Sequence, residues 1–188
     1  SAPPTESKRK ILKAFEKAEN EHDERLRRKY LNFVVVGGGP TGVELAGSIA
    51  EIAYKNIQKE FRNFSSRDSN IYLIEAGSKI LTTYSNKLSN KASKYLKSLG
   101  VTIRTDERVE DIKEMLVTTD KDKIETDNII WAAGNKASPL IEKLDTEVDL
   151  EGRAIVNKDC SIKDDQNIFV IGDAANFKNE EGTSLPGI

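Results

Sequence analysis

Three glycines and one carboxylate are the residues of this sequence whose types and spacing point most directly to chemistry. Gly37, Gly39 and Gly42 follow a short apolar run in G-x-G-x-x-G spacing. In this motif the first glycine permits a tight turn, the second lets the backbone approach a pyrophosphate, and the third lets a helix pack closely on a strand. The start of that helix points unpaired N–H groups at the phosphates. The spacing therefore predicts a dinucleotide site.

The elements on either side of the glycines support this interpretation. Residues 33–36 are apolar and mostly β-branched, as in a buried strand. After the glycines, apolar residues recur at helical spacing from Val43 to Ile57, and we expect this helix to continue to about Phe61. Strand, glycine turn and helix together are the context that the motif requires.

Glu75 is the residue that we expect to meet the adenosine ribose. After a polar loop at residues 63–69, residues 70–75 form a second apolar strand, and Glu75 is its last residue. An acid at this place accepts hydrogen bonds from ribose hydroxyls. Glu75 stands 33 positions after Gly42 rather than the usual offset of about 20, and a longer helix and loop explain the difference. The alternative is a strand-end carboxylate that faces water.

The segment before the first strand is predicted to be a charged helix. Residues 5–29 alternate Lys, Arg, Glu and Asp around a narrow apolar stripe of Ile11, Phe15 and Ala18. Such alternation is typical of a solvated helix face rather than of a nucleic-acid patch. His22 lies in this stretch without other metal-ligating residues, so we expect it at the surface.

The elements after Glu75 complete an α/β fold with a parallel sheet. Ser85 caps a helix that ends at Gly100, and residues 101–105 are a third strand. Residues 107–126 alternate loosely, as in an antiparallel meander, and residues 127–133 return to the parallel sheet. The apolar face of the capped helix is predicted to hold Leu88, Ala92, Leu96 and Leu99.

Beyond Pro139 the sequence changes character. We expect a short helix at residues 140–144 and a strand at 167–171 that ends in Gly172 and Asp173. Taken alone, Asp173 is also a good N-cap for a following helix. The first four residues resemble a linker remnant, and the sequence stops without a closing element, so we expect a piece of a longer protein.

Composition excludes several classes of function. With 29 basic and 31 acidic residues and a net charge of −2, the chain has no global field that attracts nucleic acid. No apolar run approaches the roughly 20 residues of a membrane span, and no signal peptide is visible. The single Cys160, which we expect to be packed, excludes an internal disulfide, a redox pair and a Cys-rich metal site. A reducing compartment fits this cysteine usage, and no metal site is expected.

Four segments occur in the order found in flavoproteins with two dinucleotide-binding domains. They are GGGPTGVELAG at 37–47, LIEAGSKIL at 73–81, WAAGNKASP at 131–139 and FVIGDAA at 169–175. Over nearly its whole length the sequence resembles type II NADH dehydrogenases, the non-pumping NADH:quinone oxidoreductases. The resemblance implies a Rossmann-like FAD/NAD(P)-binding fold in which an NADH domain is inserted into a split FAD domain. Residues 31–137 would be the NADH domain, 1–30 a helical lead-in and 138–188 the truncated return segment of the FAD domain.

The resemblance also assigns roles to residues. The glycine turn would hold the NADH pyrophosphate, Ala133 and Gly134 would lie near the nicotinamide, and Asp173 would bind the FAD ribitol. Glu44 matches a glutamate near the nicotinamide–flavin junction; the alternative is an acid in the first helical turn, which the helix dipole favours. No catalytic side chain is expected, because a hydride passes directly from NADH to FAD and the electrons pass on to a quinone. The expected cofactor-binding residues are Gly37, Gly38, Gly39, Pro40, Thr41, Gly42, Glu44, Glu75, Ala76, Lys79, Val109, Ala133, Gly134, Asp173 and Ala174.

Other functions remain open at this point. One alternative is another FAD-dependent NAD(P)H oxidoreductase, such as an NADH oxidase, a coenzyme A disulfide reductase or a ferredoxin reductase. A second is a nucleotide-sensing module that transfers no electrons. By resemblance the intact protein would lie in the cytoplasm on the inner face of a membrane, attached through segments absent from this sequence, and a homodimer is open. These 188 residues alone are expected to be inactive and to hold no FAD, because the FAD glycine turn would lie upstream.

Overall fold

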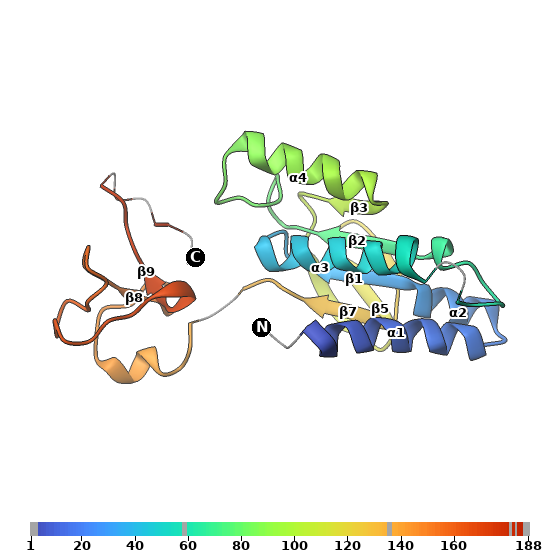
Figure 1. Ribbon diagram of the computed structural model, residues 1–188, viewed down its shortest axis with the longest axis horizontal. Coiled ribbons are helices and arrows are strands. Elements are labelled where there is room, and N and C mark those ends of the chain that lie inside the picture. Colours follow the sequence, from blue (N-terminus) through green and yellow to red (C-terminus); the bar gives the residue numbers. More distant parts are fainter. Residues whose placement is uncertain (1–3, 58–59, 135–136, 181, 183, 186–188) are drawn as a thin grey trace. The chain divides into compact units, whose positions relative to one another are not determined.

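The computed structural model describes residues 4–57, 60–134, 137–180, 182, 184 and 185 (Figure 1). The chain forms two compact units, one that ends at Ala133 and one that begins at Gly134. Each unit has a hydrophobic core of its own.

Among the described residues of the first unit, a four-stranded parallel sheet has the order β3-β2-β1-β7. Its strands are β1 (Asn32–Val36), β2 (Asn70–Ile74), β3 (Val101–Arg104) and β7 (Asn128–Trp131). β1 is central and nearly fully buried, as its continuous apolar run predicts. Because all four strands are parallel, their carboxyl ends meet at one edge of the sheet. The predicted α/β fold of Rossmann type is confirmed.

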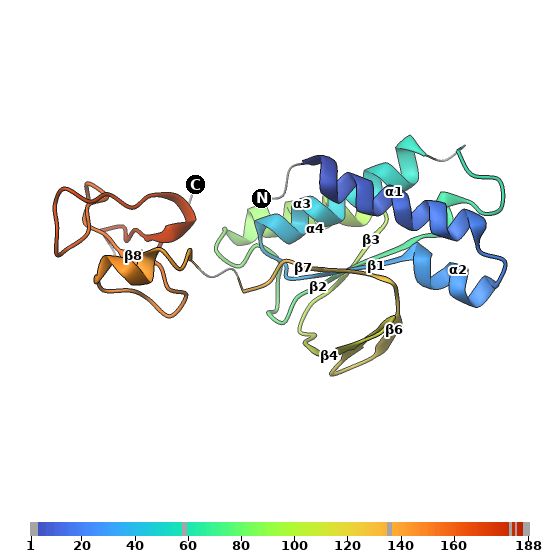
Figure 2. The ribbon, with the colours of Figure 1, turned by 90° about the horizontal axis from the view of Figure 1, so that it is seen from below.

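The two faces of this sheet are covered differently, as Figure 2 shows. Helices α1 (Pro4–Asn20), α3 (Pro40–Glu51) and α4 (Asn86–Ser98) lie on one face, and the short α2 (Glu24–Leu31) leads into β1. On the other face lies the predicted antiparallel meander, whose strands are β4 (Val109–Lys113), β5 (Leu116–Thr119) and β6 (Lys123–Glu125). Its buried residues Val117 and Ile124 pack against Val34, Val36 and Ile74 of the sheet.

The charged segment before β1 is two helices rather than one. α1 ends at Asn20, and Asp23 caps α2 because its Oδ1 accepts hydrogen bonds from the backbone N–H groups of Arg25, at 2.8 Å, and Leu26, at 3.3 Å. A short acidic side chain that satisfies helix-start donors begins a new helix. The apolar stripe of α1 is confirmed as core, because Phe15 and Ala18 are fully buried.

The helix that follows the glycines is shorter than predicted. α3 passes into one π-helical turn, η1 (Ile52–Asn56), and the helix ends before Phe61. Phe61 and Phe64 then stack on the ring of Phe15, with centroid distances of 5.8 and 6.2 Å. The predicted polar loop therefore anchors the core, and it also contains a short 3-10 helix, η2 (Ser66–Asp68).

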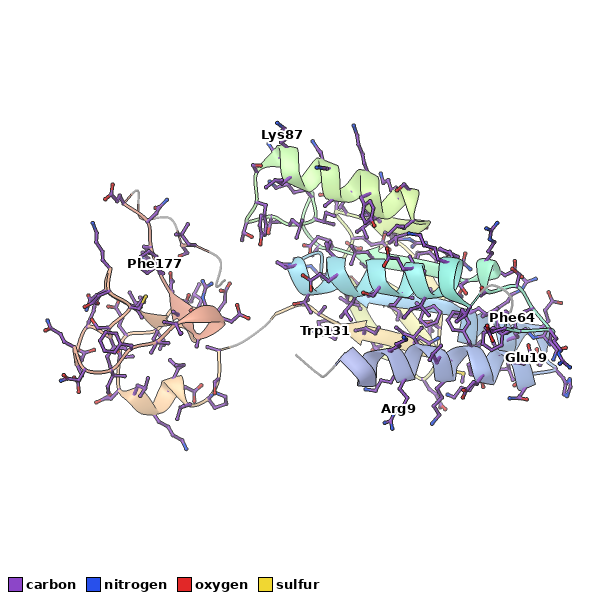
Figure 3. All side chains as sticks on the ribbon, in the orientation of Figure 1. Arg9, Glu19, Phe64, Lys87, Trp131 and Phe177 are labelled. Carbon is purple, nitrogen blue, oxygen red and sulfur yellow. The ribbon has the colours of Figure 1, made fainter. Side chains whose placement is uncertain are left out.

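The carboxylate of Glu19 fixes the same loop from outside the aromatic cluster. It accepts hydrogen bonds from the backbone N–H groups of Arg62 and Asn63 at 3.1–3.2 Å. Glu19 and Phe64 lie together near the carboxyl end of α1 (Figure 3). α1 is thus joined to the loop by both ring contacts and hydrogen bonds.

α4 is capped and stopped where the sequence predicts. The Ser85 hydroxyl accepts a hydrogen bond from Leu88 N, and Gly100 has a positive φ of +94° directly after the helix. A Cβ at Gly100 would lie 2.7 Å from the Tyr54 ring, so only glycine fits there. The predicted apolar face is correct for the buried Leu96 and for Ala92 and Leu99, which pack half-buried against the core. It is wrong for Leu88, which is 52% exposed in the first turn of the helix.

The second unit contains little regular structure in its described part. Its elements are the 3-10 helices η3 (Ile141–Leu144) and η4 (Gly172–Ala174) and the parallel pair of β8 (Ala154–Ile155) and β9 (Ala175–Asn176). Its core holds Ile141, Ala154, Ile162, Val170 and Ala175.

The strand predicted at residues 167–171 is not formed. Only Phe169 makes a bridge, to Ser161, and Phe169 and Ile171 are exposed. A strand needs a neighbour along its length, and a single bridge does not provide one. The alternative of Asp173 as an N-cap is also wrong, since Asp173 lies inside η4 and Ile171 occupies the cap position.

No helix in the described ranges is both long and apolar enough to cross a membrane. Their His, Cys, Asp and Glu side chains form no group of three or more that could hold a metal ion. His22 is exposed, as expected, and the free Cys160 is half-buried.

Gly42→Ala is expected to destabilise the first unit by about 3 kcal/mol or more, the upper range for overpacking. A Cβ at Gly42 would lie 1.8 Å from the Gly37 carbonyl oxygen, which is backbone and cannot turn aside. Gly47→Ala, on the same helix, is the matched control because its Cβ would meet only Leu96 Cδ2 at 3.5 Å. The control should be neutral or more stable by up to about 1 kcal/mol, owing to helix propensity. Urea unfolding measures both, and equal midpoints for Gly42→Ala and the parent would contradict this packing.

Candidate functional site

The glycine turn lies where β1 ends and α3 begins, at the carboxyl edge of the sheet. Gly37 has a φ of +110°, and a Cβ there would lie 2.8 Å from Ala133 N. Its own N–H donates to Ile74 O at 2.8 Å, which continues the ladder between β1 and β2. A Cβ on Gly37 would collide with the backbone of Ala133, and a Cβ on Gly42 would collide with the carbonyl oxygen of Gly37. Neither position therefore has room for a side chain.

Gly39 differs from its neighbours because none of the described residues requires it to be glycine. Its φ of −71° and ψ of −179° suit any residue, and no atom of the described residues lies within 4 Å of the place where a Cβ would be. It is the N-cap of α3 and makes no side-chain cap, and the first turn of the helix carries no acidic side chain. The positive end of the helix dipole therefore faces open space beside a backbone without side chains, which suits a phosphate. Pro40 and Thr41, both exposed, form that first turn.

Glu75 follows β2 directly and lies against the glycine turn. Its half-buried carboxylate accepts hydrogen bonds from Gly38 N at 2.6 Å and from Gly77 N at 2.7 Å. Its backbone N–H donates to Arg104 O at 2.9 Å, and its carbonyl accepts from Glu107 N at 3.1 Å. The structure thus brings together the glycines and the acid that the sequence selects.

Lys79 and Ala76 belong to the loop that follows Glu75. The Lys79 ammonium donates to Asn86 Oδ1 at 2.8 Å and to Tyr84 O at 3.2 Å, so it ties this loop to the start of α4. Ala76 is exposed beside Glu75.

Val109 and Ala133 complete the part of the predicted site in the first unit. Val109 begins β4 and packs, half-buried, in the cluster between sheet and meander. The backbone of Ala133 abuts Gly37, and its carbonyl accepts a hydrogen bond from the indole N–H of Trp131 at 2.8 Å. Trp131 stands at the end of β7 (Figure 3), and 58% of it is exposed.

Glu44 is exposed on α3 and borders a groove between α3 and α4. The other wall of this groove includes Tyr95 and Leu99. The alternative of an acid in the first helical turn is wrong, because α3 begins at Pro40 and Glu44 lies beyond its first turn.

The remaining predicted residues belong to the second unit. Gly134 has a φ of +65° and no atom near a would-be Cβ, Asp173 is exposed in η4, and Ala174 is half-buried. Asn135 and Lys136, which belong to the WAAGNKASP segment, lie outside the described residues.

Sequence reasoning missed a charged cluster beside the site. The buried Glu107 carboxylate accepts hydrogen bonds from Thr119 Oγ1 at 2.8 Å and from Arg104 at 3.2 Å. Arg104 also pairs with Asp122 at 3.0 Å. Burial lowers the pKa of Arg104, but the hydrogen bonds to Asp122 and Glu107 outweigh it, so the pKa is raised above its usual value. This cluster joins the meander to the β3 end of the sheet.

Sequence reasoning also missed two backbone donors, those of Gly77 and Leu81. Gly77 N donates to the Glu75 carboxylate at 2.7 Å, and Leu81 N donates to Gly38 O in the glycine turn at 2.7 Å. The only sequence signal for either was a glycine two positions after the acid.

Comparison with known proteins agrees with this geometry. Type II NADH:quinone oxidoreductase Ndh of Mycobacterium tuberculosis is 38% identical over an alignment of 188 positions, which covers 95% of this chain and 41% of the relative. NdhA of the same organism is 37% identical over 174 residues, covering 87% of this chain and 37% of the relative. The chain thus spans about two fifths of the length of these relatives.

Solved structures show the same fold. NDH2 from Plasmodium falciparum, in complex with NADH, superposes with a TM-score of 0.72 at 24% identity, covering 89% of this chain and 36% of that one. A water-forming NADH oxidase from Lactobacillus brevis gives 0.62 at 19% identity, covering 93% and 35%. The family described as pyridine nucleotide-disulphide oxidoreductase matches residues 5–185. Because this match spans nearly all of the sequence, the chain belongs to the pyridine nucleotide-disulphide oxidoreductase family.

Proposed function

We propose that this chain is the NADH-binding part of an FAD-dependent NADH:quinone oxidoreductase. The observation that carries the proposal is the position of the Glu75 carboxylate beside the open glycine turn, since one ligand must offer ribose hydroxyls and a pyrophosphate to use both. The names of the relatives at 37–38% identity support the quinone as electron acceptor.

Each part of NADH has a place along this edge. The pyrophosphate lies over Gly39, where the backbone is open and the start of α3 is positive. The adenosine ribose hydroxyls donate to Glu75, and the nicotinamide extends toward Ala133 and Gly134. The protein then contributes binding and orientation, while the two cofactors supply the hydride chemistry.

The second unit offers residues that fit FAD. Gly172 has a φ of +66° with open space where a side chain would be, and the exposed carboxylate of Asp173 follows it. A carboxylate with an open approach accepts hydrogen bonds from polyol hydroxyls such as those of ribitol. FAD held by these residues would supply the chemistry of hydride acceptance and of electron transfer to the quinone. In this proposal residues 138–188 belong to the FAD domain and residues 31–137 form the NADH domain, against which α1 of the lead-in 1–30 packs through Phe15.

A quinone is apolar, so the complete protein would meet it at a membrane. We infer a cytoplasmic protein that lies on the inner membrane face through segments outside this chain. NADH-dependent reduction of a soluble quinone by the complete protein, compared with its oxidase activity without quinone, tests the acceptor.

Gly39→Val is expected to abolish NADH binding and to leave the fold intact. The added side chain would fill the open space beside the start of α3, and it meets no protein atom there. Calorimetric titration of the variant with NADH measures the loss, and urea unfolding checks the fold. Gly47→Ala, which lies on α3 away from the turn, should bind as the parent does. Equal affinity of Gly39→Val and the parent would place the pyrophosphate elsewhere.

The chain is expected to bind NADH on the order of a hundredfold more tightly than NADPH. A unit charge about 4 Å from the Glu75 carboxylate costs roughly 4 kcal/mol at an effective dielectric of 20, and solvent screening reduces this. NADPH also loses the 2′-hydroxyl donor, worth about 1 kcal/mol. Two dissociation constants at one salt concentration measure the ratio.

Lys94→Met is the control for this selectivity. It removes a charge from the exposed surface of α4, outside the expected cofactor-binding residues, so the ratio should change little. Equal affinity of the parent for the two nucleotides would mean that Glu75 does not meet the ribose.

A further inference from the structure

The Glu75 carboxylate is already bonded inside the protein before any ligand is considered. One oxygen accepts from Gly38 N at 2.6 Å and the other accepts from Gly77 N at 2.7 Å. Both distances are shorter than the usual 2.9–3.0 Å or so of N–H···O bonds, as expected when the acceptor is charged. The side chain therefore spans from the glycine turn to the loop at residues 75–81.

Gly38 is the point where this turn and this loop are joined. Its N–H donates to Glu75, its carbonyl accepts from Leu81 N at 2.7 Å, and the residue is buried. A Cβ on Gly38 would lie 3.0 Å both from Glu75 Cβ and from Cγ2 of the fully buried Ile80. The middle of the turn is thus held by two hydrogen bonds and by close packing.

Three successive glycines need such support. Gly37, Gly38 and Gly39 have no side chains, and glycine has more backbone freedom to lose than any other residue. Without an acceptor, the buried Gly38 N–H would also be left unsatisfied. The conformation of the turn consequently depends on a group outside it.

We propose that Glu75 is a positioning residue for the pyrophosphate-binding turn as well as a contact for the ribose. Its carboxylate holds the Gly38 amide against the 75–81 loop and so fixes Gly39 and the start of α3. This inference rests on the proposed NADH site. The anchored carboxylate cannot turn away from the 2′-phosphate of NADPH, because each of its oxygens would then lose a hydrogen bond from a backbone N–H. Each oxygen still has a lone pair that can accept a hydrogen bond from a ribose hydroxyl.

Glu75→Gln tests the positioning role without any nucleotide. An amide has one oxygen, so its NH₂ group must face either Gly38 N–H or Gly77 N–H, and one bond becomes a contact between donors. Hydrogen exchange of that backbone amide, followed by NMR on the 188-residue chain, should be at least about tenfold faster than in the parent. Amides of β1 such as Val35 should keep their parent rates, which separates a local loss from general unfolding.

Asp106→Asn is the matched control. It removes the same charge from the neighbouring turn, where Asp106 N donates to Gly77 O at 3.0 Å. Its φ of +53° is one that asparagine tolerates. Exchange at Gly38 and Gly77 should be unchanged in this variant. If Glu75→Gln does not fold, Glu75→Asp serves instead, because it keeps the charge but is too short to reach both amides and should accelerate the same exchange.

A binding measurement separates positioning from direct ribose contact. The probes are ADP and 2′,3′-dideoxyadenosine 5′-diphosphate, which differ only in the ribose hydroxyls. If Glu75 positions the turn, Glu75→Gln weakens both probes, by roughly three- to tenfold for the one without hydroxyls. Weakening of ADP alone, or parent exchange rates at Gly38 and Gly77, would overturn the inference. Failure of the parent to bind NADH or ADP would refute the proposed function, whereas the exchange result would still decide the positioning role.

Discussion

The contact of Gly37 with the backbone around it is the constraint on which the site depends. Gly42 must approach its carbonyl oxygen, and Ala133 must approach its α-carbon, before β1, α3 and the end of β7 can meet at one edge. Any side chain at Gly37 or Gly42 would separate these elements. A ligand at this edge of the sheet can therefore approach the backbone of the glycine turn directly, and the described residues of the edge provide no reactive side chain.

Electrostatics follow from the same arrangement. The start of α3 carries no acid of its own, so its positive end is left for a ligand. The carboxylate of Glu75 is fixed beside the glycine turn by two backbone donors. Farther along the edge, Glu107 and Asp122 balance the charge of Arg104. Positive and negative groups are therefore separated along the edge in the order in which a phosphate and a ribose would meet them.

The sequence predicted the parts of this fold that local patterns specify. The strand at 33–36, the glycine turn, the Ser85 cap and the meander each follow from spacing or residue type, and each is present. Contacts between distant segments could not be read in this way. Phe61 and Phe64 looked like the end of a helix and a loop, and only the position of Phe15 shows why they turn inward. Likewise the spacing identified Glu75 but not the two backbone N–H groups that donate to it. Every residue except proline has such an N–H, so residue types alone do not indicate which ones bond to a carboxylate. The prediction of a strand at residues 167–171 was wrong for a similar reason, because a strand needs a hydrogen-bonded neighbour and the periodicity of one segment does not reveal its neighbour.

The position of Phe15 determines where the first unit can be cut when it is expressed alone or exchanged between relatives. In sequence, α2 and β1 separate α1 from the glycine motif. Phe15 of α1 nevertheless lies at the centre of the core, where its ring contacts Phe33 of β1 as well as Phe61 and Phe64. A boundary drawn at β1, where the nucleotide motif begins, would remove one wall of that core and uncover a row of aromatic rings. The smallest exchangeable module in swaps between relatives therefore begins at α1, because the core of the first unit is incomplete without Phe15.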